Sequence, residues 1–159
     1  MDYNIHMNKN IQGFTLIELI VTLAVIGVLF AMAAPNLQTT VQGNRLSGQY
    51  NDMRGDFAFA RNLAITRNVA VTISSNNGND WSNGWAVVSP TGTARISNTA
   101  NNVVISSTID SLTYKPDGTC NVTAPTAFKI CDDRTGAYGK ELNVVFSGRV
   151  NFASNVSCP

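Results

Sequence analysis

A long apolar segment near the N-terminus constrains this chain more than any other feature. Between Phe14 and Ala34 there are 21 residues and a single charged side chain, Glu18. At about 1.5 Å per residue, a helix of this length spans about 31 Å, close to the thickness of a bilayer hydrocarbon core. The segment therefore predicts a transmembrane helix over 14–35, preceded by a short polar leader over 1–13.

A cleaved secretory signal is the alternative interpretation, with cleavage after Ala33 or Ala34. It fits poorly, because the apolar run is longer than the usual stretch of about 7–15 residues. Pro35 and a continuing helical pattern also follow directly, without a clean boundary.

Glu18 has two interpretations. Placing a carboxylate near the middle of a membrane span costs roughly 2.5–3.5 kcal/mol, and placing it near the headgroups costs less. Glu18 is therefore either a tolerated residue at the membrane interface or a group that pairs with a cation after assembly. If the chain is cut after Gly13, each mature subunit begins with an ammonium group on Phe14. A neighbour's ammonium then neutralises Glu18, which fixes the axial register of packed helices because any other register buries an unpaired charge.

Residues 36–68 predict an amphipathic continuation of the helix. Apolar residues recur at steps of three and four and define one face: Leu46, Tyr50, Met53, Phe57, Ala60 and Ala64. The charged residues, including Asp56 and Arg61, are expected mostly off that face. Pro35 and the glycines beyond it predict a kink or a melted turn over 35–48, and the helix is expected to end near Asn68.

From residue 69 the apolar pattern alternates, which predicts a β-rich globular domain over 69–159. Trp81 and Trp85 are expected in its core. The fold class is therefore α+β, with the second half of the helix packed on an antiparallel sheet. The candidate strands are Val69–Ser74, Gly84–Ser89, Thr93–Ile96, Val103–Ser107, Leu112–Lys115, Ala127–Cys131, Leu142–Phe146 and Arg149–Phe152, separated by turn signals such as "NNGND", "PDG" and "DRTGAYG".

The three cysteines predict one disulfide and one remaining thiol if the domain is exported. The expected strand order brings Cys131 and Cys158 to the same end of the C-terminal hairpin and favours a bridge between them. Pairings of Cys120 with Cys131 or with Cys158 remain alternatives.

No catalytic constellation is found in the sequence. The single histidine, His6, lies in the leader, which leaves no Ser–His or Cys–His pair in the mature chain and no zinc-binding pattern. Asp132 and Asp133 are interpreted as turn residues. We expect no enzymatic activity, cofactor, metal or small-molecule substrate. The low charged content of 13%, about half the globular average of roughly 25%, suits an extracytoplasmic surface.

The stretch "GFTLIE" at 13–18 resembles the class III signal of type IV prepilins and type II secretion pseudopilins. The resemblance implies cleavage between Gly13 and Phe14 by a prepilin peptidase, N-methylation of Phe14, and a role for Glu18 in subunit recruitment. It also implies a leader in the cytoplasm and a domain beyond about residue 40 on the other side of the inner membrane of a Gram-negative bacterium.

The rest of the chain resembles the FimT/FimU (GspH-like) group of minor pilins and pseudopilins. The resemblance implies a pilin fold and a minor component of a type IV pilus, placed at the tip with other minor pilins and the major pilin, where it primes assembly. The type II secretion relatives cap a short pseudopilus instead. The matching stretches are "ARNLAITRN" from residue 60, "WSNGWAVV" at 81–88, "AFKICDDRTG" at 127–136 and "NVVFSGRV" at 143–150.

One branch of this group binds DNA through a G-R-x-R motif. The matching positions here start at Gly148 and Arg149, but the second arginine is replaced by Asn151. Residues 115–159 contain five basic and four acidic side chains, a poor balance for the several phosphate contacts that non-specific binding needs. Two interpretations stay open: Arg149 is a solvated residue beside a tight turn, or it contacts DNA together with Lys140 and Arg134.

Overall fold

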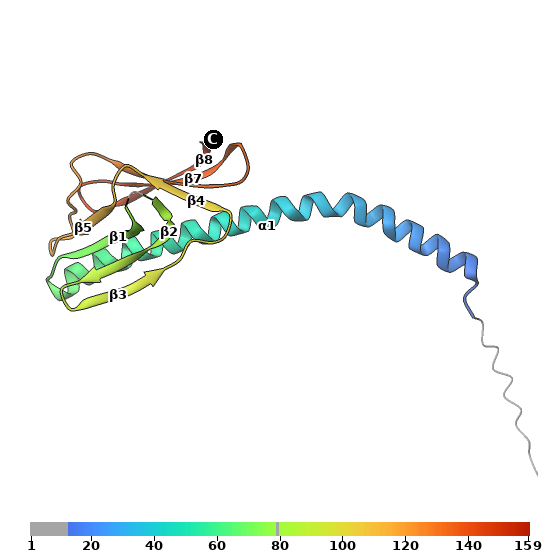
Figure 1. The fold of residues 1–159 in the computed structure, drawn as a ribbon, viewed down its shortest axis with the longest axis horizontal. Helices are drawn as coiled ribbons and strands as arrows, with labels where there is room; N and C mark the ends of the chain where they lie inside the picture. The colour runs from blue at the N-terminus through green and yellow to red at the C-terminus, as the bar shows by residue number, and fades with distance from the viewer. Residues whose placement is uncertain (1–12, 79) are drawn as a thin grey trace, which may run out of the picture. The chain divides into compact units, whose positions relative to one another are not determined.

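The computed structural model describes residues 13–78 and 80–159, without the side chains of 33–36. Most of the predicted leader, with His6, lies outside the described residues. The chain divides into two compact units, up to Thr39 and from Thr40 onward. The elements (Figure 1) are α1 (Leu16–Arg67), β1 (Val71–Asn77), β2 (Asp80–Ser89), β3 (Gly92–Ser97), β4 (Val103–Ser107), β5 (Ser111–Tyr114), β6 (Thr126–Asp132), β7 (Gly136–Val144) and β8 (Val150–Cys158).

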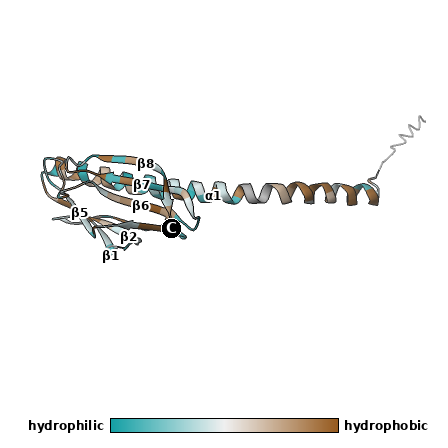
Figure 2. Ribbon diagram, turned by 90° about the horizontal axis from the view of Figure 1, so that it is seen from above, coloured by the Kyte–Doolittle hydropathy of each residue, from teal (hydrophilic) through white to brown (hydrophobic). Residues whose placement is uncertain are grey.

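The first unit contains the N-terminal part of α1, whose residues 16–32 are all exposed. This helix is long and apolar enough to cross a membrane, judged by length and composition (Figure 2). Its start is set by Thr15, whose Oγ1 accepts a hydrogen bond from the Glu18 backbone N–H at 3.3 Å, as a helix N-cap does. The Thr22 hydroxyl donates to the Leu19 carbonyl at 2.8 Å, so this polar group is satisfied within the helix.

Helix α1 continues without a break across 35–48, so the predicted alternative of a melted turn there is wrong. The predicted kink concerns the relative direction of the two units and stays a prediction. The helix ends at Arg67, close to the predicted position. Asn68 follows with φ of 53°, the left-handed conformation that commonly terminates helices.

The second unit contains an eight-stranded sheet in the order β5-β1-β2-β4-β6-β7-β8, with β3 paired to β2. All of these pairings are antiparallel. Each of the eight predicted strands overlaps an observed one. The largest difference is β7, which begins at Gly136 within the predicted "DRTGAYG" turn.

Gly139 explains why that stretch was mistaken for a turn. A Cβ atom on Gly139 would lie 2.7 Å from the Cys158 sulfur and 2.8 Å from the Val156 carbonyl oxygen. The glycine therefore permits close packing between the two paired strands. Close approach of a neighbouring segment is a common reason for a glycine within a strand.

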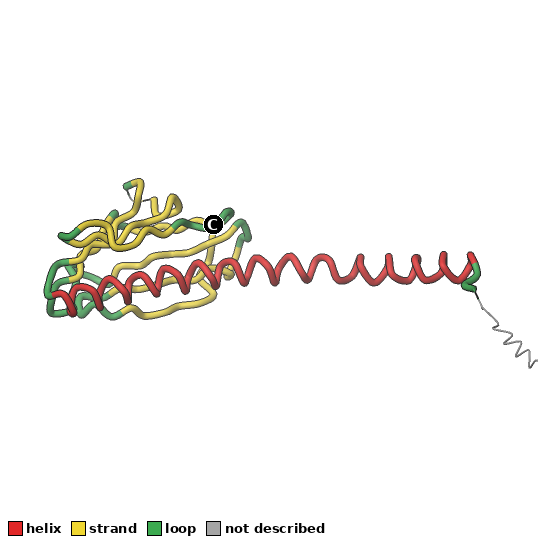
Figure 3. The backbone as a smooth tube through the Cα atoms, turned by 90° about the horizontal axis from the view of Figure 1, so that it is seen from below, coloured by secondary structure: helices red, strands yellow, loops and turns green. Residues whose placement is uncertain are grey.

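The core of the second unit lies between the sheet and the C-terminal part of α1 (Figure 3). All six residues of the predicted apolar helix face are buried, and Met53, Phe57, Ala60 and Ala64 are fully so. Trp81 and Trp85 are also fully buried, as predicted. The rings of Phe57 and Trp81 each lie edge-on against Phe128 with centroids 4.9 Å apart, so one aromatic cluster connects helix and sheet.

Candidate functional site

The predicted processing and assembly residues lie at the exposed start of the first unit. Gly13 and Phe14 precede the helix in an irregular segment, and Phe14 is 82% exposed. Glu18 lies in the first helical turn, where the helix dipole favours a carboxylate, and no cation pairs with it in the described part of the chain. The described residues thus present an exposed apolar helix segment whose carboxylate, near the start, has no cationic partner among them.

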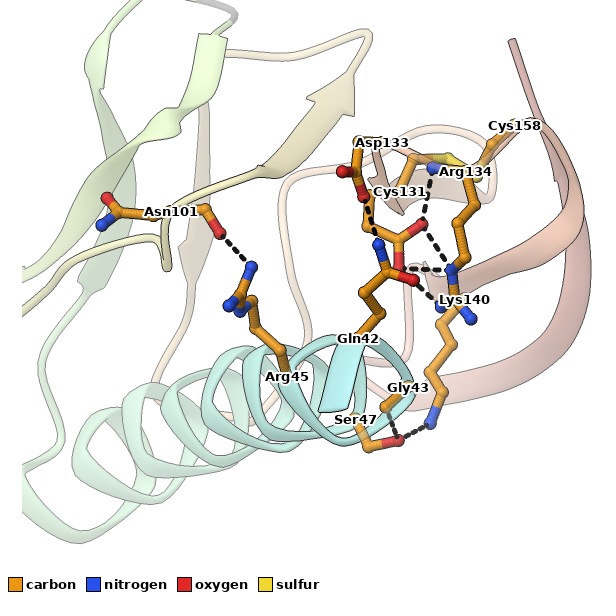
Figure 4. Close-up of polar contacts among 11 residues, drawn as sticks. Gln42, Gly43, Arg45, Ser47, Asn101, Cys131, Asp133, Arg134, Lys140 and Cys158 are labelled. Atoms are coloured by element: carbon orange, nitrogen blue, oxygen red, sulfur yellow. Dashed lines mark hydrogen bonds and ion pairs between the residues drawn. A yellow bond between two sulfur atoms is a disulfide. The ribbon is translucent and has the colours of Figure 1, made fainter. Parts of the chain in front are cut away.

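The predicted disulfide between Cys131 and Cys158 is confirmed. The two Cα atoms are 5.8 Å apart, and 27 positions separate the cysteines in sequence. Cys120 is a free, buried thiol that donates to the Val145 carbonyl at 3.1 Å. The bridge closes the corner where β6, β7 and the end of β8 meet (Figure 4).

Arg134 lies at this corner and is bound within the fold. Its guanidinium donates from Nε and Nη2 to the Asp132 carboxylate and lies 4.6 Å from the Tyr138 ring centroid. Burial alone would raise the pKa of Asp132, but hydrogen bonds from the side chain and backbone of Arg134 hold it below its usual value. The neighbouring Asp133 accepts a hydrogen bond from Gln42 at 3.2 Å. Both aspartates therefore serve as local structural anchors.

Lys140 is also engaged, on the helix side of the same corner. Its ammonium donates to the Ser47 hydroxyl at 2.7 Å and lies 5.4 Å from the Tyr50 ring centroid (Figure 4). Arg45 donates to the Asn101 carbonyl at 3.3 Å. These contacts fasten the start of the second unit's helix to the sheet and to the loop before β4.

Arg149 lies apart from the other two predicted DNA contacts. It is exposed next to the β7–β8 turn, whereas Arg134 precedes the opposite end of that hairpin. It lines a pocket of about 400 Å³ between the turn and the last turns of α1. We call this pocket the arginine groove, and its lining residues are Arg54, Phe57, Ala58, Arg61, Asn62, Ile65, Gly148, Arg149 and Val150.

Arg61 builds the inner wall of the arginine groove. Its Nε donates to the Gly118 carbonyl at 3.0 Å and its Nη2 to the Ser147 carbonyl at 3.2 Å, which ties two loops to the helix. Gly148 sits between them with φ of 73°, and a Cβ atom there would collide with the Gly118 carbonyl. Gly148 thus lies in a tight turn, and nothing in the sequence indicated the contact between this turn and Arg61.

Asp56 is an exception to the expectation that charged residues of the helix lie mostly off the apolar face, because its carboxylate is buried. Asp56 is only 3% exposed. It accepts hydrogen bonds from the Trp85 indole at 2.9 Å, from Arg95 at 2.6 Å and from the Ser97 hydroxyl. The burial of Asp56 could have been predicted from its position three residues after Met53 and next to Phe57. That position places it at the edge of the buried helix face.

Within the described residues, no group of three or more His, Cys, Asp or Glu side chains is arranged to hold a metal ion. The described residues thus present an apolar helix with a carboxylate near its start, and a basic groove on the surface of the second unit.

Comparison with known proteins places the chain in a family. The family model described as "Type II transport protein GspH" matches residues 49–148, and the model described as "Prokaryotic N-terminal methylation motif" matches residues 8–34. No curated protein matches the chain.

The chain is also similar to two crystal structures of the type IV minor pilin FimU from Pseudomonas aeruginosa. The TM-scores are 0.64 and 0.62 and the identities 21% and 20%, over 73% and 72% of this chain and 93% and 97% of the solved chains. At this identity the likeness shows the fold, and it confirms the predicted pilin fold. Because the GspH match spans more than half of the sequence, the chain belongs to the GspH family of minor pilins and pseudopilins.

Proposed function

We propose that this protein is a minor pilin of a type IV pilus, incorporated at or near the tip, where it primes assembly and supports pilus functions such as twitching, adhesion or DNA uptake. The observation that carries the proposal is the apolar segment 14–32, which is exposed throughout and whose carboxylate has no cationic partner among the described residues. The type IV minor pilins among similar structures favour a pilus, and the GspH match favours a type II secretion pseudopilus as the alternative.

The proposed sequence of events begins in the inner membrane. A prepilin peptidase cuts between Gly13 and Phe14, Phe14 is N-methylated, and α1 holds the periplasmic second unit at the membrane. The segment before the helix is irregular and exposed at the proposed cleavage point, as a protease substrate must be. The helix then leaves the lipid for the apolar centre of a filament and contacts the major pilin and other minor pilins.

The Glu18 carboxylate gives this transfer a defined register. A buried, unpaired charge costs several kcal/mol, and the described part of the chain supplies no cation to Glu18. The ammonium of Phe14 on a neighbouring subunit supplies one. Packing without this pair leaves both an acid and an amine unpaired in an apolar surrounding, so the paired register is favoured.

The test uses a strain that lacks the native gene and produces the full-length chain or its variants. Glu18→Ala is expected to be processed normally, with Phe14 as the first residue by mass spectrometry, but to fall about tenfold or more in sheared filaments. Thr22→Ala is the matched control, because it removes a polar group from the same segment without removing a charge. Gly13→Ala is expected to leave an uncut precursor.

Wild-type amounts of Glu18→Ala in the filament fraction would contradict the pairing, and a mature N-terminus other than Phe14 would contradict the processing. Loss of surface pili with unchanged protein secretion in the deletion strain supports a pilus. The reverse result supports the pseudopilus. The predicted DNA contact of Arg149, Lys140 and Arg134 stays a prediction, and the structure does not bring these three residues together.

A further inference from the structure

The arginine groove carries an uncompensated positive charge. Three of its lining residues are arginines, and none of the described residues that line it is acidic. The side chains of Arg54 and Arg149 are exposed, and neither guanidinium makes a hydrogen bond or an ion pair with any described residue. Asp117 directly precedes Gly118, whose carbonyl binds Arg61. The Asp117 carboxylate already accepts hydrogen bonds from the backbone N–H and the hydroxyl of Thr119 at 2.8 and 2.7 Å.

The groove has one arginine that the fold holds in place. Arg61 has five N–H donors and gives two of them to the Gly118 and Ser147 carbonyls, which leaves three for a ligand. An arginine anchored in this way loses little conformational entropy when it binds a planar acceptor. The ring edge of buried Tyr114 lies next to Gly148. The Tyr114 hydroxyl has no hydrogen-bond partner in the described part of the chain.

Apart from Asn62, the remaining side chains that line the groove are apolar. Ala58 is exposed, Ile65 is 45% exposed and Val150 is half-buried, whereas the only aromatic lining residue, Phe57, is fully buried. A pocket of about 400 Å³ with aliphatic walls suits a side chain with a charged end. A nucleic acid is less favoured, because the groove offers no exposed ring for base stacking. Arg134 and Lys140 are bound elsewhere, which keeps the basic surface from extending into a track for phosphates.

We propose that the arginine groove binds the carboxylate of an Asp or Glu side chain presented by a neighbouring pilin subunit. The anchored guanidinium of Arg61 offers a planar pair of N–H donors, which matches a carboxylate in the bidentate geometry typical of arginine. Arg54 and Arg149 line the same groove and add to its positive charge. This inference rests on the proposed function, because it requires that the chain is assembled among other pilins.

The first experiment identifies the occupant in the native assembly. The full-length chain carries a photo-crosslinking amino acid in place of Asn62, an exposed residue of the groove, and is produced in piliated cells. After illumination, mass spectrometry of the cross-linked product is expected to show a peptide of another pilin subunit that contains an Asp or Glu next to the cross-link. Failure to recover such a peptide from piliated cells overturns the proposal.

The second experiment tests the charge match. The double variant Arg54→Glu/Arg149→Glu leaves the structural contacts of Arg61 in place and is expected to fall about tenfold in sheared filaments. Replacing the cross-linked acidic residue of the partner with arginine is expected to restore incorporation, an effect that a merely destabilising change does not produce. Arg67→Glu reverses an exposed charge on the same helix outside the groove and is expected to leave incorporation unchanged.

Two further results overturn the inference. The first is undiminished incorporation of the double variant, or no rescue by the partner exchange. The second is a gel shift of a DNA duplex by the detergent-solubilised full chain that the double variant loses, because the groove then serves a nucleic acid. Absence of even the wild-type chain from filaments contradicts the proposed function. Normal incorporation of both the wild type and the double variant contradicts the groove alone.

Discussion

The buried Asp56 carboxylate is the polar group whose removal should affect the second unit most. It lies on α1 and accepts hydrogen bonds from Trp85 on β2 and from Arg95 and Ser97 on β3. One side chain therefore connects the helix to two strands from inside the core. Asp56→Ala removes all three bonds at once, and only some of the released donors are able to find water.

The expected loss follows from the exposure of each donor. The Trp85 indole is fully buried, and a buried donor left unsatisfied costs about 1–3 kcal/mol. The Arg95 side chain is 46% exposed and regains water, so its ion pair contributes about 0–1 kcal/mol. With a small further loss at half-buried Ser97, we expect Asp56→Ala to lower the free energy of unfolding by about 2–4 kcal/mol. That is a large share of the roughly 5–15 kcal/mol typical of a native protein.

Urea unfolding of the detergent-solubilised full chain, followed by tryptophan fluorescence, measures this loss. The two tryptophans, Trp81 and Trp85, both lie in the core of the second unit and report on it alone. With a denaturant slope of about 2 kcal/mol per molar, the middle of the usual range, the midpoint should fall by about 1–2 M. Asp52→Ala, at an exposed carboxylate one turn earlier, should stay within about 0.5 kcal/mol of the wild type. If Asp56→Ala also stays within that range, the reasoning from the buried indole is refuted.

Two further predictions concern the disulfide corner. The variant Cys131→Ser/Cys158→Ser should lose about 3–4 kcal/mol of unfolding free energy, because the bridge closes a loop of 27 residues. Dithiothreitol should lower the urea midpoint of the wild type by as much as the double substitution does, and should leave the midpoint of the variant unchanged. A wild-type midpoint that dithiothreitol does not shift would contradict this prediction. The fold lowers the pKa of Asp132, so its pairing with Arg134 contributes its full stabilisation at pH values above the ordinary pKa of 3.8. This stabilisation is lost as the pH falls through the lower pKa of the folded state. The stability difference between the wild type and Arg134→Gln should therefore shrink between about pH 5 and about pH 2, and a constant difference would count against the pair.

Local periodicity in the sequence was sufficient to predict the elements of the fold. The steps of three and four from Leu46 to Ala64 identified the buried helix face, because these spacings return to the same side of a helix at every turn. Alternation identified a segment within each observed strand. The bridge between Cys131 and Cys158 followed from where adjacent strands end, which antiparallel connections largely determine.

The sequence was less informative wherever one segment meets another. Asp56 lies 39 positions before its partner Arg95, and neither residue carries a local sign of the other. Gly139 looks like a turn residue, although its small size serves the packing of Cys158. The arginine groove joins residues 54–65 of α1 to residues 148–150 of the last hairpin, so it exists only once the helix packs beside that turn. Motif matching found Arg149 alone and assigned it partners that the fold places elsewhere.

Assembly needs two kinds of contact, and they are separable by experiment. A pairing between Glu18 and a neighbour's Phe14 is available to every subunit that shares the N-terminal motif, so it adds equally to all pairings and distinguishes none of them. Discrimination among neighbours must then come from the second unit, where the arginine groove offers charge complementarity to some partners and not to others. Glu18→Ala should therefore reduce the yield of the cross-link from the groove without changing the peptide that is captured. Arg54→Glu/Arg149→Glu should instead change which peptide is captured, and an unchanged peptide would place the choice of neighbour on another surface.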